Sequence, residues 1–175
     1  MKFHTLLAAS LFFALPAAHA AKAHVHGEGK LDVAIDKEKI TLNLELPLDA
    51  AVGFERAPKN DKEKAALAAA DKALKDTATL FVPTQAAHCS VVSTDVKIPN
   101  LGGDGKHDHA HEGEEHHADI DASYVFRCTN PAALKGIETT IFKHFKRLYR
   151  LEVQRAGPGG QGAMRLTPNK PMLNW

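Results

Sequence analysis

Alternating apolar and polar side chains constrain the fold of this chain most strongly. Successive side chains of a β-strand point to opposite faces, so apolar residues at every second position indicate a strand with one buried face. Residues 31–35 and 40–46 alternate in this way on either side of Asp36-Lys37-Glu38, which predicts a β-hairpin. Residues 119–128 alternate again and predict a further strand. The apolar positions of the three runs are Leu31, Val33, Ile35, Ile40, Leu42, Leu44, Leu46, Ile120, Ala122, Tyr124, Phe126 and Cys128.

One long helix is predicted between these strands. Asn60 can cap a helix over residues 61–75, and Glu63 stands at capping-box spacing. Leu67, Ala70 and Leu74 mark its inner face, and its alanine content suggests close packing on a sheet. Asn130-Pro131 predicts a short helix. Further strands are expected near residues 81–83, 89–92, 96–98, 137–141, 151–153 and 163–167, with GPGGQG at residues 157–162 as a hairpin loop. The fold class expected is α+β, a mainly antiparallel β-sheet with one principal helix.

The N-terminus has the pattern of a secretory signal peptide. Lys2 precedes the apolar run Leu6–Leu15, Pro16 interrupts it, and Ala18-His19-Ala20 is a small-x-small cleavage site. The run is too short to span a membrane. We therefore expect residues 1–20 to be removed and residues 21–175 to form a single domain exported to a periplasm.

Charge composition excludes two classes of partner. The chain carries 22 Lys and Arg residues against 21 Asp and Glu residues, and loss of Lys2 with the signal peptide balances them. Such a protein has no basic surplus for nucleic acid and no basic amphipathic helix for lipid. Neither nucleic-acid binding nor direct membrane insertion is expected.

Two cysteines, Cys89 and Cys128, bracket a histidine-rich segment. In an oxidising compartment an isolated pair usually forms a disulfide. In the chain-entropy model, closing a loop of about 40 residues stabilises the fold by on the order of 4 kcal/mol. The alternative is a thiolate metal site that includes His88, but the pair lacks the short spacing of a zinc-cysteine motif. We expect the disulfide to staple the strands on either side of the loop.

The segment between the cysteines is rich in metal ligands. Residues 107–117 read HDHAHEGEEHH, and imidazole and carboxylate are the groups that zinc prefers beside thiolate. Because residues 100–118 contain almost no apolar side chain, we expect a flexible, disordered His-rich loop that collects divalent cations. A merely solvated polar loop is the alternative. The candidate ligands of this loop are His107, His109, His111, His116 and His117.

A second candidate site lies at the start of the mature chain. His24, His26 and Glu28 fall at alternate positions, so in a strand they would share one face. Zinc needs about four ligands, and the missing ones could come from the loop, from His88, from His144 or from water. Alternatively, the two histidines are ordinary surface residues near a frayed terminus.

Catalysis has little support in the sequence. The chain has no H-E-x-x-H, no G-x-S-x-G and no glycine-rich phosphate loop after a strand. A catalytic zinc would need a rigid pocket, which would have to be built around Glu55 or Asp49. We therefore expect a binding protein and not an enzyme.

Several segments resemble the ZrgA family of periplasmic zinc-binding proteins. They are HVHGEGKLDVAI, GFERAP, IFKHFKRLYRLEVQ, GQGAMRLTP and the terminal MLNW, together with the cysteine pair around a His-rich insert. The resemblance covers essentially the whole mature chain and implies zinc binding through His24, His26 and the loop histidines. Many members carry histidine where this chain has Arg56. Arginine cannot ligate zinc, although the neighbouring Glu55 could.

The expected function is capture of Zn²⁺ in the periplasm and support of its uptake by a membrane zinc-transport complex. Nickel or copper is an alternative cargo, because histidine binds both and intrinsic affinity favours copper. An envelope adaptor whose loop merely buffers metal is the alternative from another class.

Overall fold

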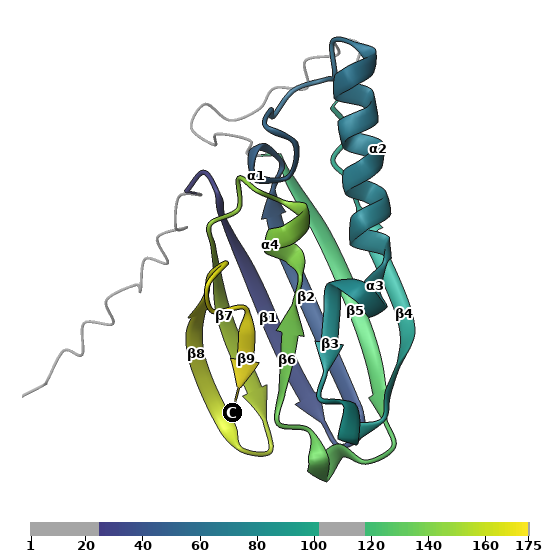
Figure 1. Ribbon diagram of the computed structural model, residues 1–175, viewed down its shortest axis with the longest axis vertical. Coiled ribbons are helices and arrows are strands. Elements are labelled where there is room, and N and C mark those ends of the chain that lie inside the picture. Colours follow the sequence, from purple (N-terminus) through teal and green to yellow (C-terminus); the bar gives the residue numbers. More distant parts are fainter. Residues whose placement is uncertain (1–24, 102–117, 175) are drawn as a thin grey trace, which may run out of the picture.

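Two β-sheets packed face to face form most of the protein (Figure 1). The computed structural model describes residues 25–101 and 118–174. The larger sheet has six strands in the order β4-β5-β2-β1-β7-β8, and the smaller has three in the order β3-β6-β9. The smaller sheet and the helices lie over the same face of the larger sheet in Figure 1. The α+β class predicted from the sequence is confirmed.

The larger sheet grows from the predicted hairpin. Its β1 and β2 pair antiparallel, β2 pairs antiparallel with β5, and β5 with β4. On the other side β1 pairs with β7 in parallel, and β7 pairs antiparallel with β8. The strands are β1 (Glu28–Asp36), β2 (Lys39–Pro47), β4 (Cys89–Lys97), β5 (Asp119–Cys128), β7 (Arg150–Gly157) and β8 (Gly160–Leu166).

The smaller sheet comprises β3 (Phe81–Pro83), β6 (Gly136–Thr139) and β9 (Met172–Asn174). The strand predicted over residues 137–141 corresponds to β6 but ends earlier, because Ile141 begins helix α4 (Ile141–His144). Ile141 and Phe142 are buried. A short apolar run fits a buried helical turn as well as a buried strand, which is why the boundary was misplaced.

The helix predicted over residues 61–75 is α2 (Asp61–Lys75), and the Asn60 side chain accepts a hydrogen bond from Glu63 N at 3.0 Å. Only Ala70 and Leu74 of this helix are buried, and its N-terminal half projects beyond the strands in Figure 1. Close packing on the sheet is therefore restricted to its C-terminal half. Two short helices, α1 (Leu48–Val52) and α3 (Thr77–Leu80), and 3-10 turns at Gln85–Ala87 and Pro131–Ala133 complete the helical elements of the described residues.

Two strand predictions need correction. Residues 89–92 and 96–98 were predicted as separate strands, but β4 is continuous and passes through an irregularity between Val91 and Ser93. The glycine-rich segment at residues 157–162 was predicted as a loop, yet Gly157 pairs with Gly160 and only two residues form the turn. Gly160 has φ 93°, a conformation that glycine adopts at no steric cost, so the glycines serve a tight hairpin.

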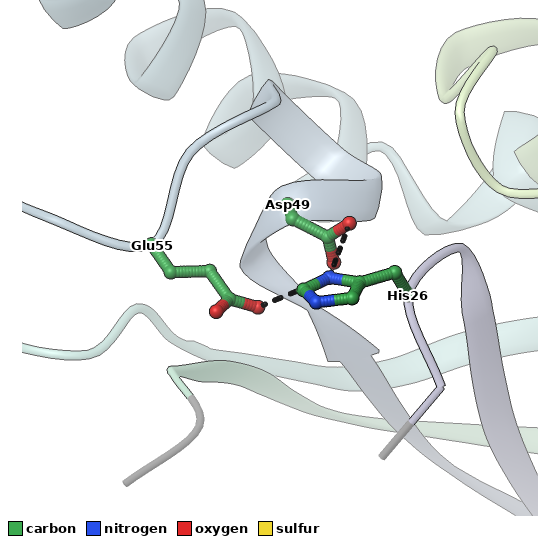
Figure 2. A group of neighbouring side chains, drawn as sticks. All are labelled: His26, Asp49 and Glu55. Atoms are coloured by element: carbon green, nitrogen blue, oxygen red, sulfur yellow. Dashed lines mark ion pairs between the residues drawn. The ribbon is translucent and has the colours of Figure 1, made fainter. Parts of the chain in front are cut away.

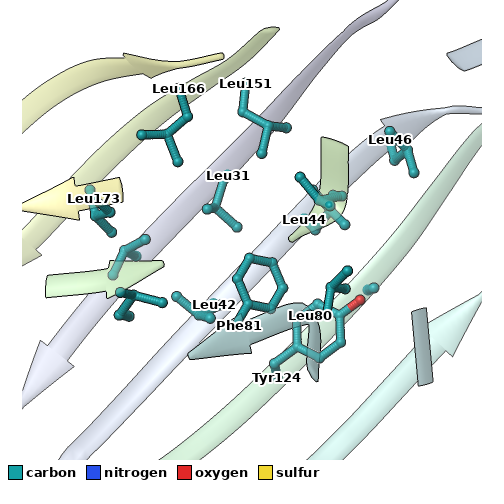
Figure 3. Packing of buried hydrophobic residues seen from close by; sticks show 14 of the residues in the cluster. Leu31, Leu42, Leu44, Leu46, Leu80, Phe81, Tyr124, Leu151, Leu166 and Leu173 are labelled. Atoms are coloured by element: carbon teal, nitrogen blue, oxygen red, sulfur yellow. The ribbon is translucent and has the colours of Figure 1, made fainter. Parts of the chain in front are cut away.

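The core fills the space between the two sheets (Figure 3). The alternate apolar residues of β1, β2 and β5 are buried, as the sequence pattern predicts, except that Ile35 at the end of β1 is only partly buried. Phe81 of the smaller sheet packs on Tyr124 of the larger, with ring centroids 5.1 Å apart. This contact places the two sheets directly against each other.

The predicted disulfide between Cys89 and Cys128 is confirmed, with an S–S distance of 2.07 Å. The two cysteines face each other directly in the β4–β5 ladder. The segment between these strands leaves β4 and enters β5 at the opposite end of the ladder, where Lys97 pairs with Asp121. The disulfide therefore holds the two strands at the end remote from the insert.

One buried polar group in this core has no hydrogen-bond partner among the described residues. Tyr124 is fully buried, and its hydroxyl makes no hydrogen bond to any of the described residues. Burial raises the pKa of the Tyr124 phenol. We expect Tyr124→Phe to raise the free energy of unfolding by about 1 kcal/mol, because it removes an unsatisfied hydroxyl and keeps the ring. Chemical denaturation measures this change.

The matched control is Tyr124→Ala, which also removes the ring and should cost about 3–5 kcal/mol. A Phe variant less stable than the parent protein would mean that the hydroxyl has a hydrogen-bond partner.

Candidate metal centre

Three metal-ligating side chains converge at one end of the larger sheet (Figure 2). They are His26, Asp49 and Glu55, and one donor atom of each lies within 4.8 Å of the other two. His26 Nδ1 is 3.0 Å from Asp49 Oδ2 and 4.0 Å from Glu55 Oε1. An imidazole and two carboxylates form a nitrogen and oxygen donor set suited to a divalent cation such as zinc.

The hairpin explains why residues distant in sequence meet here. Because β1 and β2 run antiparallel, with Lys30 opposite Glu45, the chain before β1 and the chain after β2 lie at the same end of the sheet. His26 precedes β1, and Asp49 lies in α1 directly after β2. The strand register therefore brings this histidine to this carboxylate.

The end of α1 positions the third candidate ligand, Glu55. Leu48 and Ala50 are buried and anchor this short helix to the core, while Asp49 between them is only partly buried. Gly53 has φ 89° and its N–H donates to Asp49 O at 2.8 Å, which ends the helix in a left-handed turn. The turn redirects the chain so that Glu55 lies beside His26 (Figure 2).

Burial differs sharply among the three donors. The side chain of His26 is 73% exposed, whereas those of Asp49 and Glu55 are 16% and 28% exposed. Asp49 Oδ1 is buried and accepts no hydrogen bond from the described residues. A buried carboxylate oxygen without a partner is costly, and a bound cation would remove that cost.

A separate ion pair holds the segment that carries Glu55. Arg56 donates from its two terminal nitrogens to the two carboxylate oxygens of Glu63, at 2.7 and 2.9 Å. The Arg56 guanidinium also lies 5.3 Å from the centroid of the Phe54 ring. Glu63 accepts a further hydrogen bond from Lys59 N at 2.7 Å, in place of the Asn60 N–H that a complete capping box would use. The segment between α1 and α2 is thus tied to the first turn of α2.

The residues predicted as ligands are only partly brought together. His26 belongs to the cluster, whereas Glu28 contacts Tyr149 and Arg150 instead. His88 lies beside the disulfide and His144 lies in α4, and neither is part of this group. The predicted ligands outside the described residues are His24, His107, His109, His111, His116 and His117.

Asp49 was considered in the sequence only as part of a possible enzyme pocket, and Glu55 was considered for that pocket and as a substitute for a family histidine. One signal could have identified both. A predicted hairpin places the residue before its first strand beside the residues after its second strand, and both acids follow β2 within eight residues.

One described end of the His-rich insert, Ala118, also lies close to this centre. Leu48 N donates to Ala118 O at 2.9 Å, so the chain enters β5 directly beside α1. Ala118 is one residue from His117 in the sequence, and Leu48 is one residue from Asp49. The insert therefore joins the fold at the same end as the cluster.

Comparison with known proteins identifies the family of this chain. The sequence matches the ZrgA family, described as zinc uptake proteins, over residues 23–175. No curated protein matches this chain. Among the described residues, no helix is both long and apolar enough to cross a membrane.

The Arg56–Glu63 pair leads to a prediction about acid stability. Hydrogen bonds from Arg56 and from Lys59 N lower the pKa of Glu63 from 4.5 to about 2. A carboxyl whose pKa is lowered on folding stabilises the fold above its unfolded pKa, and this stabilisation is lost as the pH falls from about 4.5 to 2. We expect Glu63→Gln to lower the melting temperature at pH 7 by a few degrees. The difference from the parent protein should shrink as the pH falls through that window.

Asp71→Asn is the matched control, because it removes a carboxylate from an exposed pair with Lys75 on the same helix. It should change the melting temperature less, since surface pairs contribute little. Equal effects of the two substitutions at pH 7 would contradict a structural role for the Arg56–Glu63 pair.

Proposed function

Because the chain belongs to the ZrgA family of zinc uptake proteins, we propose that it captures Zn²⁺ outside the cytoplasm and passes it to a membrane transport complex. The observation that carries the proposal is the convergence of His26, Asp49 and Glu55. In this proposal the three side chains bind the ion as cargo, and no chemical step follows.

The spacing of the donors suits a zinc ion. Tetrahedral zinc with bonds of roughly 2.0–2.2 Å separates its ligand atoms by about 3.3–3.6 Å. The distances from His26 Nδ1, 3.0 Å to Asp49 and 4.0 Å to Glu55, bracket this value. Side-chain movements of less than about 1 Å would therefore seat the ion.

The exposure of the site supports capture and release over permanent retention. Structural zinc sites use four protein ligands, whereas this cluster supplies three and leaves one position for water or an incoming ligand. His26 is largely exposed, so the open side faces solvent. A transport partner could add its own ligand there and draw the ion away.

We assign the insert a supporting role. Its histidines, with His24, would bind further zinc ions and raise the local supply near the cluster. The hydrogen bond between Leu48 and Ala118 supports this role, because it fixes one end of the insert beside α1. The N-terminal pattern of residues 1–20 supports export to the periplasm as the place of capture.

Zinc calorimetry on the mature protein, residues 21–175, tests the site. Deletion of residues 106–117 should remove several zinc equivalents and leave one site. In that background we expect His26→Ala, Asp49→Asn and Glu55→Gln each to weaken zinc binding. Loss of a group that only orients a metal ligand costs about 10–100-fold, and loss of a ligand should cost at least as much.

His144→Ala is the matched control, since this exposed histidine lies outside the cluster. It should leave the affinity unchanged. If the insert-deleted protein binds no zinc, the cluster is not the functional site and the insert carries all binding.

The pH dependence gives an independent check. Imidazole must be neutral to bind zinc, so affinity should fall between about pH 7.5 and 5.5, where histidine gains its proton. The same titrations at both pH values measure the change. Constant affinity across this range would mean that carboxylates alone hold the ion.

A further inference from the structure

The Glu28 carboxylate contacts the first residue of β7, Arg150, and the residue before it, Tyr149. Tyr149 Oη donates to Glu28 Oε1 at 2.7 Å, and Arg150 Nη2 lies 2.5 Å from the same oxygen. The parallel register of β1 and β7 places Glu28 directly opposite Arg150. The Glu28 side chain is only 12% exposed, so its charge is balanced by the arginine and not by solvent.

These contacts anchor the turn that carries His26. Glu28 N donates to Val25 O, and Tyr149 N donates to Gly27 O, each at 2.9 Å. The turn therefore has one internal hydrogen bond and two links to Tyr149, one through its backbone and one through its hydroxyl.

Gly27 packs closely against the chain segment that precedes β7. Its φ is 75°, in the left-handed region that favours glycine. A Cβ at this position would lie 2.7 Å from both Arg147 O and the Tyr149 ring. The turn is thus seated directly on the chain segment that precedes β7.

His26 itself has little packing to define its orientation. With 73% of its side chain exposed, the direction of the imidazole depends mainly on the backbone of residues 25–28. That backbone is held by the contacts of Gly27 and Glu28.

We propose that Glu28 is a positioning residue of the metal centre, which acts through Tyr149 and Arg150 to hold the His26 imidazole toward Asp49 and Glu55. The inference rests on the proposed function. It gives Glu28 a role other than the zinc ligation expected from the sequence, because its carboxylate contacts Tyr149 and Arg150 and is not one of the three clustered donors.

Two substitutions test this role in the insert-deleted protein, with zinc calorimetry as the first readout. Glu28→Gln keeps the shape but removes the charge that pairs with Arg150, and Tyr149→Phe removes only the hydroxyl. Each should weaken zinc binding by about 10-fold, the lower range for groups that orient a metal ligand. Stoichiometry should remain one ion per chain.

Absorption of bound Co²⁺ distinguishes positioning from ligation. The visible bands of Co²⁺ depend on its donor atoms and geometry, so a saturated Glu28→Gln protein should show the spectrum of the parent. His26→Ala should change the spectrum, because it removes a donor. Glu152→Gln is the matched control. This residue also pairs with Arg150, at 3.0 Å, but does not contact the turn, so the variant should bind zinc normally.

An altered Co²⁺ spectrum in Glu28→Gln would overturn the inference, because it would make Glu28 a ligand. Unchanged zinc affinity in both Glu28→Gln and Tyr149→Phe would also overturn it. Failure of the proposed function looks different: the insert-deleted parent would bind no zinc, or His26→Ala would bind it as tightly as the parent.

Discussion

The antiparallel pairing of β1 with β2 is the interaction on which the rest of the structure depends. Its register buries the alternate apolar residues of both strands on one face, and the smaller sheet covers that face. The same register brings the start of β1 to the end of β2, so that His26 faces α1. A slip of one residue would expose the core positions and separate the metal donors in a single step. Fold and site are therefore specified by one set of hydrogen bonds.

Rigidity is distributed unevenly around the metal centre. Asp49 is held by a helix whose neighbouring residues are buried, and Glu55 lies on a segment tied to α2 by Arg56 and Glu63. His26, by contrast, projects into solvent from a turn. In the proposed function, two carboxylates with limited freedom and one exposed imidazole would let an ion enter without rearrangement of the core. Such an arrangement would favour exchange over permanent binding.

Much of the fold could be predicted from the sequence, because long periodic patterns have few alternative interpretations. The hairpin and the helix over residues 61–75 follow from alternation and capping, and the disulfide follows from an isolated cysteine pair with predicted export. The division of the strands between two sheets could not be predicted, since short apolar runs such as residues 137–141 do not encode which edge they pair with. Of the three clustered donors, only His26 was predicted as a ligand from the sequence. The alternation that grouped His26 with Glu28 applies to an extended chain, whereas Gly27 turns the backbone between them.

The position of the disulfide has a consequence for the covalent continuity of the molecule. Cys89 and Cys128 enclose the whole insert within one closed ring of chain. A single proteolytic cut inside the insert would leave two polypeptides that remain covalently joined and still paired along β4 and β5. His26, Asp49 and Glu55 would all stay on the same fragment, N-terminal to the cut. A protein built in this way would keep the cluster at the end of its sheet after a cut in its acidic, histidine-rich segment.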